Sequence, residues 1–175
     1  MLKMFSTQLT GLLNTLHEKE SFAFEDSARL LAQAAVGEGN VYLYGEKEMD
    51  AVISEALCST EPFQSAKKWD GKDPSLSYQD RVIIFTRYTH DEQAVAAAKW
   101  LLEKNIPFVA VSTVLPVDSE ADSLADLADV HIDLRLKKGL LPDEEGNRFG
   151  YPASIAALYV YYGIKLTFDE IIAEY

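Results

Sequence analysis

The stretch Arg81-Val-Ile-Ile-Phe-Thr86 decides the fold class of this chain. Its four central residues are all β-branched or aromatic, which favours a strand, and no polar residue interrupts them. A strand with one face in water alternates polar and apolar residues, whereas a continuous apolar run is typical of a strand buried on both faces. The stretch therefore predicts a central strand of a parallel sheet that helices cover on both sides.

Four further strands are predicted around this one. The segments 41–44 and 108–111 are β-prone and apolar, 65–69 is a weaker candidate, and 130–136 alternates as an edge strand does. All four are separated from one another by segments with turn or helix signals. The sheet is therefore expected to have five strands.

Apolar residues at helical spacing predict helices between the strands. The predicted helices cover residues 2–19, 26–36, 49–57, 91–104, 120–128 and 152–162. Asp26 is expected to begin the second helix as its N-cap, and Thr167 and Glu170 have the spacing of a capping box for a short last helix. Residues 137–150 are expected to form a long loop.

Strands that alternate with helices imply an α/β fold. We expect a doubly wound, five-stranded parallel sheet in the order 2-1-3-4-5, with right-handed crossovers, as a Rossmann-type three-layer sandwich. No linker or repeat divides the sequence, so residues 1–175 are expected to form one domain. Within it, 1–38 hold the N-terminal helices, 39–136 the sheet, and 137–175 a loop and the C-terminal helices.

The charge balance argues against nucleic acid and membrane partners. The chain has 16 basic and 28 acidic residues and a formal net charge of −12, which does not attract phosphate backbones or anionic lipids. The N-terminus lacks the unbroken apolar stretch of a signal peptide, and no apolar run reaches the roughly 18 residues of a membrane span. Cys58 is the only cysteine, so an internal disulfide is excluded. A soluble cytoplasmic protein is expected.

No sequence motif predicts a cofactor or a metal. The glycine-rich nucleotide-binding patterns, His-Glu-x-x-His and Gly-x-Ser-x-Gly are absent, and the cysteine and histidines lack zinc-site spacing. A divalent cation among Glu46, Glu48 and residues 90–92 is a possibility, but helix capping explains the acids equally well. We therefore expect neither a metal nor a cofactor.

The predicted topology places a ligand site between two loops. In such sheets ligands bind beyond the carboxyl ends of the strands, where the winding direction reverses. With the order 2-1-3-4-5 this point lies between the first and third strands, which brings residues 45–49 beside residues 86–92. The candidate ligand-binding residues are Gly45, Glu46, Lys47, Thr86, Arg87 and Thr89, together with Ser112 after the next strand.

The order of these segments is similar to that of the sugar isomerase (SIS) domain, and the closest branch looks like the phosphoheptose isomerases. The resemblance covers about residues 20–165. It rests on Gly39-Asn-Val-Tyr-Leu-Tyr-Gly45, on Arg81-Val-Ile-Ile-Phe-Thr86 with the polar turn after it, and on Leu124-Ala-Asp-Leu-Ala-Asp-Val-His-Ile132. The chain also resembles a small uncharacterised SIS-like group from Bacillus-type bacteria. Membership implies a phosphorylated sugar as ligand, a homodimer or tetramer, and a site at a subunit interface.

Both loops depart from the pattern of the phosphoheptose isomerases. Where those enzymes have Gly-Asn-Gly-Gly-Ser, only Gly45 carries over. In their Ser-x-Ser-Gly-x-Thr loop, Thr86 matches as a hydroxyl and Thr89 stands at the glycine. The final helix, where those enzymes have a catalytic histidine, has none between Ile155 and Tyr162.

Aldose–ketose isomerisation needs a base with a pKa near neutrality and a donor for the carbonyl oxygen. On the two loops, Glu48 and His90 are the candidates for these catalytic roles, and a solvated surface position is the alternative for both. The opening turns of the helices allow phosphate binding through free N–H groups, helped by Lys47 and Arg87. The capping-box spacing of Thr89 and Glu92 would instead use those N–H groups internally.

Two functions therefore stay open. One is a phosphosugar-binding protein related to the isomerases, and the other is a noncatalytic dimeric sensor or interaction module on the same fold. The loop 137–150 is a lid, a means to deliver Arg148 to a partner subunit, or a mobile surface loop. Apolar surface on the first helix and on the final helix, with Tyr159, Tyr161 and Tyr162, predicts a homodimer.

Overall fold

The computed structural model describes residues 1–116 and 122–175, and it confirms the predicted parallel sheet. All neighbouring strands run parallel, in the order β2-β1-β3-β4-β5. The strands are β1 (Val41–Gly45), β2 (Ala66–Lys68), β3 (Arg81–Tyr88), β4 (Phe108–Thr113) and β5 (Val130–Asp133).

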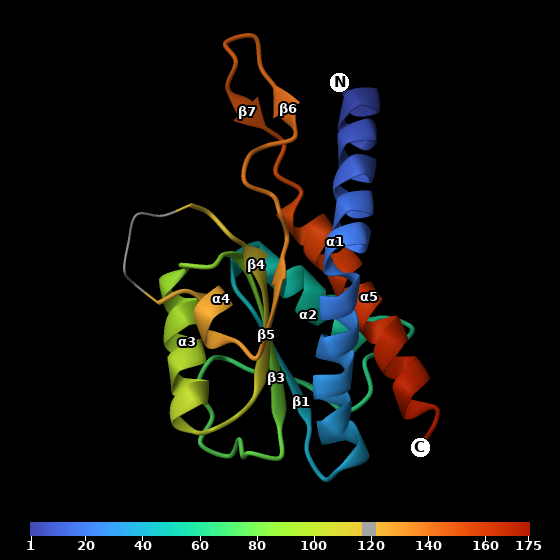
Figure 1. Cartoon of the computed structure of the whole chain (residues 1–175), viewed down its shortest axis with the longest axis vertical. Helices are drawn as coiled ribbons and strands as arrows, with labels where there is room; N and C mark the ends of the chain where they lie inside the picture. Colours follow the sequence, from blue (N-terminus) through green and yellow to red (C-terminus); the bar gives the residue numbers. More distant parts are fainter. Residues whose placement is uncertain (117–121) are drawn as a thin grey trace.

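Helices cover both faces of this sheet, as Figure 1 shows. On one side lie α1 (Leu2–Val36), α2 (Asp50–Cys58) and α5 (Ala153–Ile172), and on the other lie α3 (Glu92–Glu103) and α4 (Leu124–Leu127). A short 3-10 turn, η1 (Lys47–Met49), links β1 to α2. None of the helices in the described ranges is long and apolar enough to cross a membrane.

The alternation of side chains along the strands divides the core into two layers. On β1, Leu43 packs with the residues of α1, α2 and α5, whereas Tyr44 packs with those of α3. On β3, Phe85 and Ile84 face opposite layers in the same way, and both are fully buried. The central strand is therefore buried on both faces, as its unbroken apolar run predicts.

The N-terminal region forms one helix, so the prediction of two helices is wrong. α1 runs through the segment 20–25, and Asp26 does not cap a new helix. That segment contains no glycine or proline, and its Phe24 continues the buried stripe toward the sheet. Without a local breaker, tertiary burial on one face keeps the helix continuous.

The C-terminal region is also one helix, which corrects the predicted capping box at Thr167 and Glu170. The hydroxyl of Thr167 donates to the carbonyl oxygen of Gly163 within the helix, at 3.0 Å. A Cβ atom at Gly163 would lie 2.8 Å from Cδ2 of Phe24. This glycine therefore lets α5 approach α1 closely without ending the helix.

Part of the predicted loop 137–150 is a small antiparallel hairpin. Its strands are β6 (Leu141–Pro142) and β7 (Arg148–Phe149), and the carboxylate of Asp143 accepts hydrogen bonds from the N–H groups of Glu145 and Asn147 in the turn, at 2.9 and 2.7 Å. The hairpin and the N-terminal half of α1 project together beyond the sheet (Figure 1). We call these two segments, residues 1–15 and 137–151, the arm.

The helix predicted at 120–128 is shorter in the structure. α4 begins at Leu124, after a capping box in which Ser123 and Asp126 bond to each other's backbone N–H groups. Residues 120 and 121 of the prediction lie outside the described residues. The capping box explains the late start, because it satisfies the first free N–H groups of the helix.

The two-sided burial of β3 leads to a stability prediction. Phe85→Ala removes a fully buried ring and is expected to lower the free energy of unfolding by about 3–5 kcal/mol, as large cavities in cores do. Phe22→Ala is the matched control, because 83% of Phe22 is exposed on α1, and it should change stability by less than about 0.5 kcal/mol. Urea unfolding of both variants measures this, and equal effects would contradict the assigned core.

Candidate functional site

The sheet brings the two predicted loops together. β1 and β3 are neighbours with Gly45 opposite Phe85, so residues 45–49 and 86–92 leave the sheet at the same edge. We call these segments the switch-point loops. The N–H of Glu46 donates to the carbonyl oxygen of Phe85 at 3.0 Å, which joins the two loops at their bases.

Gly45 has a packing role at the end of β1. A Cβ atom at this position would lie 2.8 Å from the carbonyl oxygen of Met49 and 2.8 Å from Cγ1 of Ile53. A side chain here would push η1 and α2 away from the strand. Gly45, the one residue shared with the isomerase loop, therefore serves the close approach of the backbone.

An ion pair connects the two loops. Nε of Arg87 donates to Oε1 of Glu48 at 2.7 Å, and both side chains are partly exposed. This hydrogen bond lowers the pKa of Glu48 below its ordinary value. A carboxylate with a lowered pKa is a weak base at neutral pH, so the ion pair works against Glu48 as the base of an isomerase.

The loop after β3 is closed by its own carboxylate. One oxygen of Asp91 accepts hydrogen bonds from the hydroxyl of Thr86 and from the N–H of Tyr88, the latter at 3.2 Å. Asp91 is the N-cap residue of α3, but its side chain makes no capping hydrogen bond. The carboxylate thus satisfies two donors of the loop that a bound anion would otherwise use.

The predicted capping box between Thr89 and Glu92 is wrong. Thr89 is fully buried, and its hydroxyl has no partner among the described residues. Its backbone is tied instead to β4 and α4, because its N–H donates to Thr113 and its carbonyl accepts from Leu124. These backbone bonds pull Thr89 into the protein, away from the first turn of α3.

Glu46 lies at the base of the first loop and is almost fully buried. Only 8% of the residue is exposed, and Oε2 of its carboxylate has no hydrogen-bond partner among the described residues. Oε1 lies 3.4 Å from Nζ of Lys47, whose own side chain is largely exposed. Lys47 has a positive φ of 53°, a conformation that non-glycine residues adopt rarely.

A cavity of about 310 Å³ opens beside these loops, between the segment after β2 and the first turns of α3. We call it the Tyr44 pocket; its lining residues are Tyr44, Asp70, Gly71, Lys72, Gln93, Ala96 and Ala97. The hollow exists because its walls carry small residues, and Gly71 has a positive φ of 101°. Its volume is at the lower end of the range for small-molecule sites.

The sequence analysis missed this pocket. Tyr44 belongs to the predicted first strand, but nothing in the sequence shows that Gly71 lies near it; a Cβ atom at Gly71 would lie 3.6 Å from Cε2 of Tyr44. The only local signal is the Asp-Gly dipeptide at 70–71, which marks a turn. The approach of this turn to α3 is a tertiary feature.

Ser112 and His90 lie toward α4 rather than between the switch-point loops. Ser112 is fully buried, and its Oγ is 2.9 Å from Nε2 of His131. Burial lowers the pKa of His131, so this ring is neutral at neutral pH and pairs with the serine. His90 is half-buried, and its charge lowers the pKa of Asp126 on α4.

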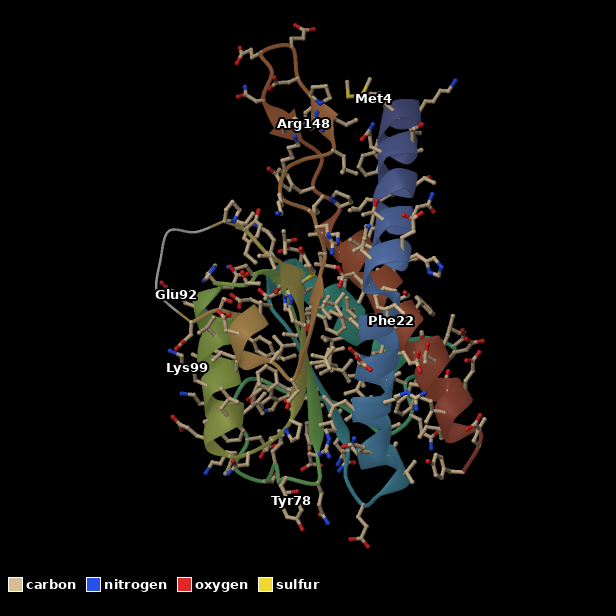
Figure 2. All side chains as sticks on the ribbon, viewed as in Figure 1. Met4, Phe22, Tyr78, Glu92, Lys99 and Arg148 are labelled. Carbon is tan, nitrogen blue, oxygen red and sulfur yellow. The ribbon has the colours of Figure 1, made fainter. Side chains whose placement is uncertain are left out.

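Arg148 lies on the arm and binds its own hairpin. Its Nε donates to the carbonyl oxygen of Gly139 at 2.9 Å, and one Nη donates to that of Leu140 at 2.8 Å. Figure 2 shows Arg148 beside Met4 at the end of the molecule, and Glu92 at the start of α3. Within one chain, Arg148 therefore supports the hairpin.

The acids of this region do not form a metal centre. In the part of the chain that the structure describes, no group of three or more His, Cys, Asp or Glu side chains could hold a metal ion. The acids of the switch-point loops are engaged individually, Glu48 with Arg87 and Asp91 with Thr86 and Tyr88.

Known proteins share this architecture. The uncharacterized protein YwjG of Bacillus subtilis (strain 168) is 43% identical over 175 residues, which are 100% of this chain and 99% of the relative. Among solved structures, c3406 of E. coli CFT073 in complex with arabinose 5-phosphate has a TM-score of 0.69 at 14% identity, and the match covers 98% of this chain and 89% of that one. The phosphoheptose isomerase GmhA of Neisseria gonorrhoeae has a TM-score of 0.67 at 10% identity, over 94% and 95% of the two chains.

These findings confirm both resemblances that the sequence shows. The solved structures share the SIS fold with this chain, and the Bacillus relative matches it from end to end. The family model described as "Domain of unknown function (DUF2529)" matches residues 1–172. The chain therefore belongs to the DUF2529 family.

Proposed function

We propose that this protein binds a phosphorylated sugar at the switch-point loops, with Arg87 as the main phosphate ligand. The observation that supports this most is the state of the Arg87 guanidinium. Its Nε is held by Glu48, and no other hydrogen bond of its guanidinium is found among the described residues. A guanidinium has five N–H donors in a planar fork, so those on the Nη atoms can bind a phosphate in bidentate fashion.

Lys47 is the second basic residue that the phosphate would meet. It stands on the other loop, and its side chain is 67% exposed. The two basic residues come from loops that β1 and β3 hold side by side. The complex of c3406 with arabinose 5-phosphate supports a ligand of this kind on this fold.

The Tyr44 pocket is the proposed place for the sugar body. The charge of Asp91 acts both on Arg87 and on the hydroxyl of Tyr44, because it raises the pKa of both groups. Asp91 therefore stands between the proposed phosphate position and the pocket. Tyr44, Gln93 and Asp70 line the pocket with groups that hydrogen-bond to sugar hydroxyls.

A noncatalytic role on the same site is the second candidate. Its supporting observation is the Glu48–Arg87 ion pair, which lowers the pKa of Glu48. His90 lies toward α4, and α5 has no histidine between Ile155 and Tyr162. A protein that binds a phosphosugar without isomerising it would act as a sensor or interaction module.

We propose further that the protein is a homodimer and that the arm forms its interface. The arm exposes apolar side chains on both of its segments, among them Leu2 (77%), Met4 (50%) and Phe149 (40%). Such a projecting apolar surface is typical of an interface. Tyr161, which the sequence analysis placed at the interface, is instead buried in the core against Phe63.

The first prediction concerns the phosphate ligand. Arg87→Ala should weaken binding of arabinose 5-phosphate about tenfold to a hundredfold, because a hydrogen bond to a charged group contributes about 1.5–3 kcal/mol. Arg29→Ala is the control, since Arg29 forms a similar exposed ion pair with Glu25 on α1. Isothermal titration calorimetry measures both. Unchanged affinity in Arg87→Ala, or an equal loss in both variants, would place the phosphate elsewhere.

The second prediction separates binding from isomerisation. A bound aldose phosphate should keep the hydrogen on C2 in D2O, because formation of an enediol requires a base that Glu48 does not provide. Proton NMR of glucose 6-phosphate with the protein follows this hydrogen directly. Exchange for deuterium that depends on Glu48, and is absent in Glu48→Gln, would show that the protein is an isomerase.

The third prediction concerns assembly. Light scattering at micromolar concentration should give about twice the chain mass of 19.5 kDa, or a higher multiple. Phe149→Glu on the arm should shift the protein to a monomer, because a charge would be buried in the interface. Tyr78→Glu, at the opposite end of the molecule in Figure 2, should not. A monomeric wild type would refute the dimer.

A further inference from the structure

Glu46 is a buried carboxylate that the protein itself does not fully satisfy. It is the first residue after β1, its side chain is only 7% exposed, and its Oε2 has no hydrogen-bond partner among the described residues. To bury an ionised carboxylate without a partner costs free energy. A native protein with such a group needs an explanation, and a ligand that supplies the missing donor is one.

The backbone directs Glu46 toward the Tyr44 pocket. Glu46 is extended, with φ −93° and ψ 130°, so its side chain lies on the same face of the sheet as Tyr44, two residues earlier. The hydroxyl of Tyr44 is close enough for the charges of Glu46 and Asp91 to raise its pKa. Asp91 precedes the lining residue Gln93 by two positions. The two acids therefore flank the pocket at the carboxyl edge of the sheet.

The neighbouring basic residues leave this negative charge largely unbalanced. Nζ of Lys47 lies 3.4 Å from Oε1 of Glu46, but Lys47 is 67% exposed, and exposed ion pairs contribute little. Arg87 is bound to Glu48 at 2.7 Å. Asp91 adds a second carboxylate, whose one oxygen is used by Thr86 and Tyr88.

We infer that the sugar phosphate bound here carries a protonated amino group, which donates a hydrogen bond to Oε2 of Glu46. The inference rests on the proposed function and narrows its ligand to aminosugar phosphates. A sugar hydroxyl would supply the donor alone, whereas an ammonium group supplies the donor and the opposite charge, and charge-assisted hydrogen bonds are the stronger ones. The phosphate then meets Arg87 and Lys47, and the ammonium meets Glu46.

The test compares sugar phosphates that differ only by an amino group in place of a hydroxyl. The pairs are glucosamine and glucose 6-phosphate, mannosamine and mannose 6-phosphate, and galactosamine and galactose 6-phosphate. Calorimetry with the wild type should show a preference of about tenfold for the amino member of at least one pair, as a charged donor gains over a neutral one.

Two variants locate the preference. Glu46→Gln keeps the shape of the side chain and removes its charge, so it should reduce the preference to about one. Glu48→Gln neutralises the other acid of the same loop and serves as the matched control. It should change the affinity for both members of a pair by the same factor, because it affects the phosphate end of the ligand.

The outcomes distinguish the inference from the proposed function. Equal binding of both members in every pair, or an amino preference that survives in Glu46→Gln, overturns the inference and leaves phosphosugar binding intact. If no sugar phosphate binds, the proposed function fails and the inference with it. The melting temperature without ligand should stay the same or rise in Glu46→Gln; a drop would show that Glu46 serves folding instead, and would also overturn the inference.

Discussion

Burial of both faces of β3 is the constraint on which the other elements depend. Because Ile84 and Phe85 face opposite layers and neither is exposed, helices must lie on both sides of the sheet. A parallel sheet with helices on both faces requires right-handed crossovers and a point where the winding reverses. The position of the switch-point loops follows from this point, so the location of the site is a consequence of core packing.

Acidic residues take over the work of an anion in these loops. Asp91 accepts the hydrogen bonds of Thr86 and Tyr88, and Glu48 neutralises Arg87. Both contacts order the loops without a ligand. They also set the condition that a ligand must meet, because a phosphate has to compete with Glu48 for Arg87. The carboxylate of Glu46 stands apart from this arrangement, since one of its oxygens has no partner among the described residues.

Much of the architecture was predictable because it depends on local chemistry and on the period of apolar residues. The strand order, the position of the two loops and the family resemblance followed from the run at 81–86 and from its neighbours. The helices α1 and α5 were harder. Their middle segments contain turn-like or capping residues such as Asp26 and Thr167, and only the packing of Phe24 on Gly163 shows that both helices continue.

The sequence by itself determined the fold class, the two loops and the residue types available at their edge. Only the tertiary structure decided which of these residues meet. Thr89 and Asp91 stand at comparable positions before α3, yet Thr89 is drawn into the protein by β4 and α4, while Asp91 turns back to Thr86. The Tyr44 pocket likewise depends on the approach of Gly71 to α3. Spacing along a chain limits the possible partners of a side chain, but the distances that select one partner are set by how distant segments pack.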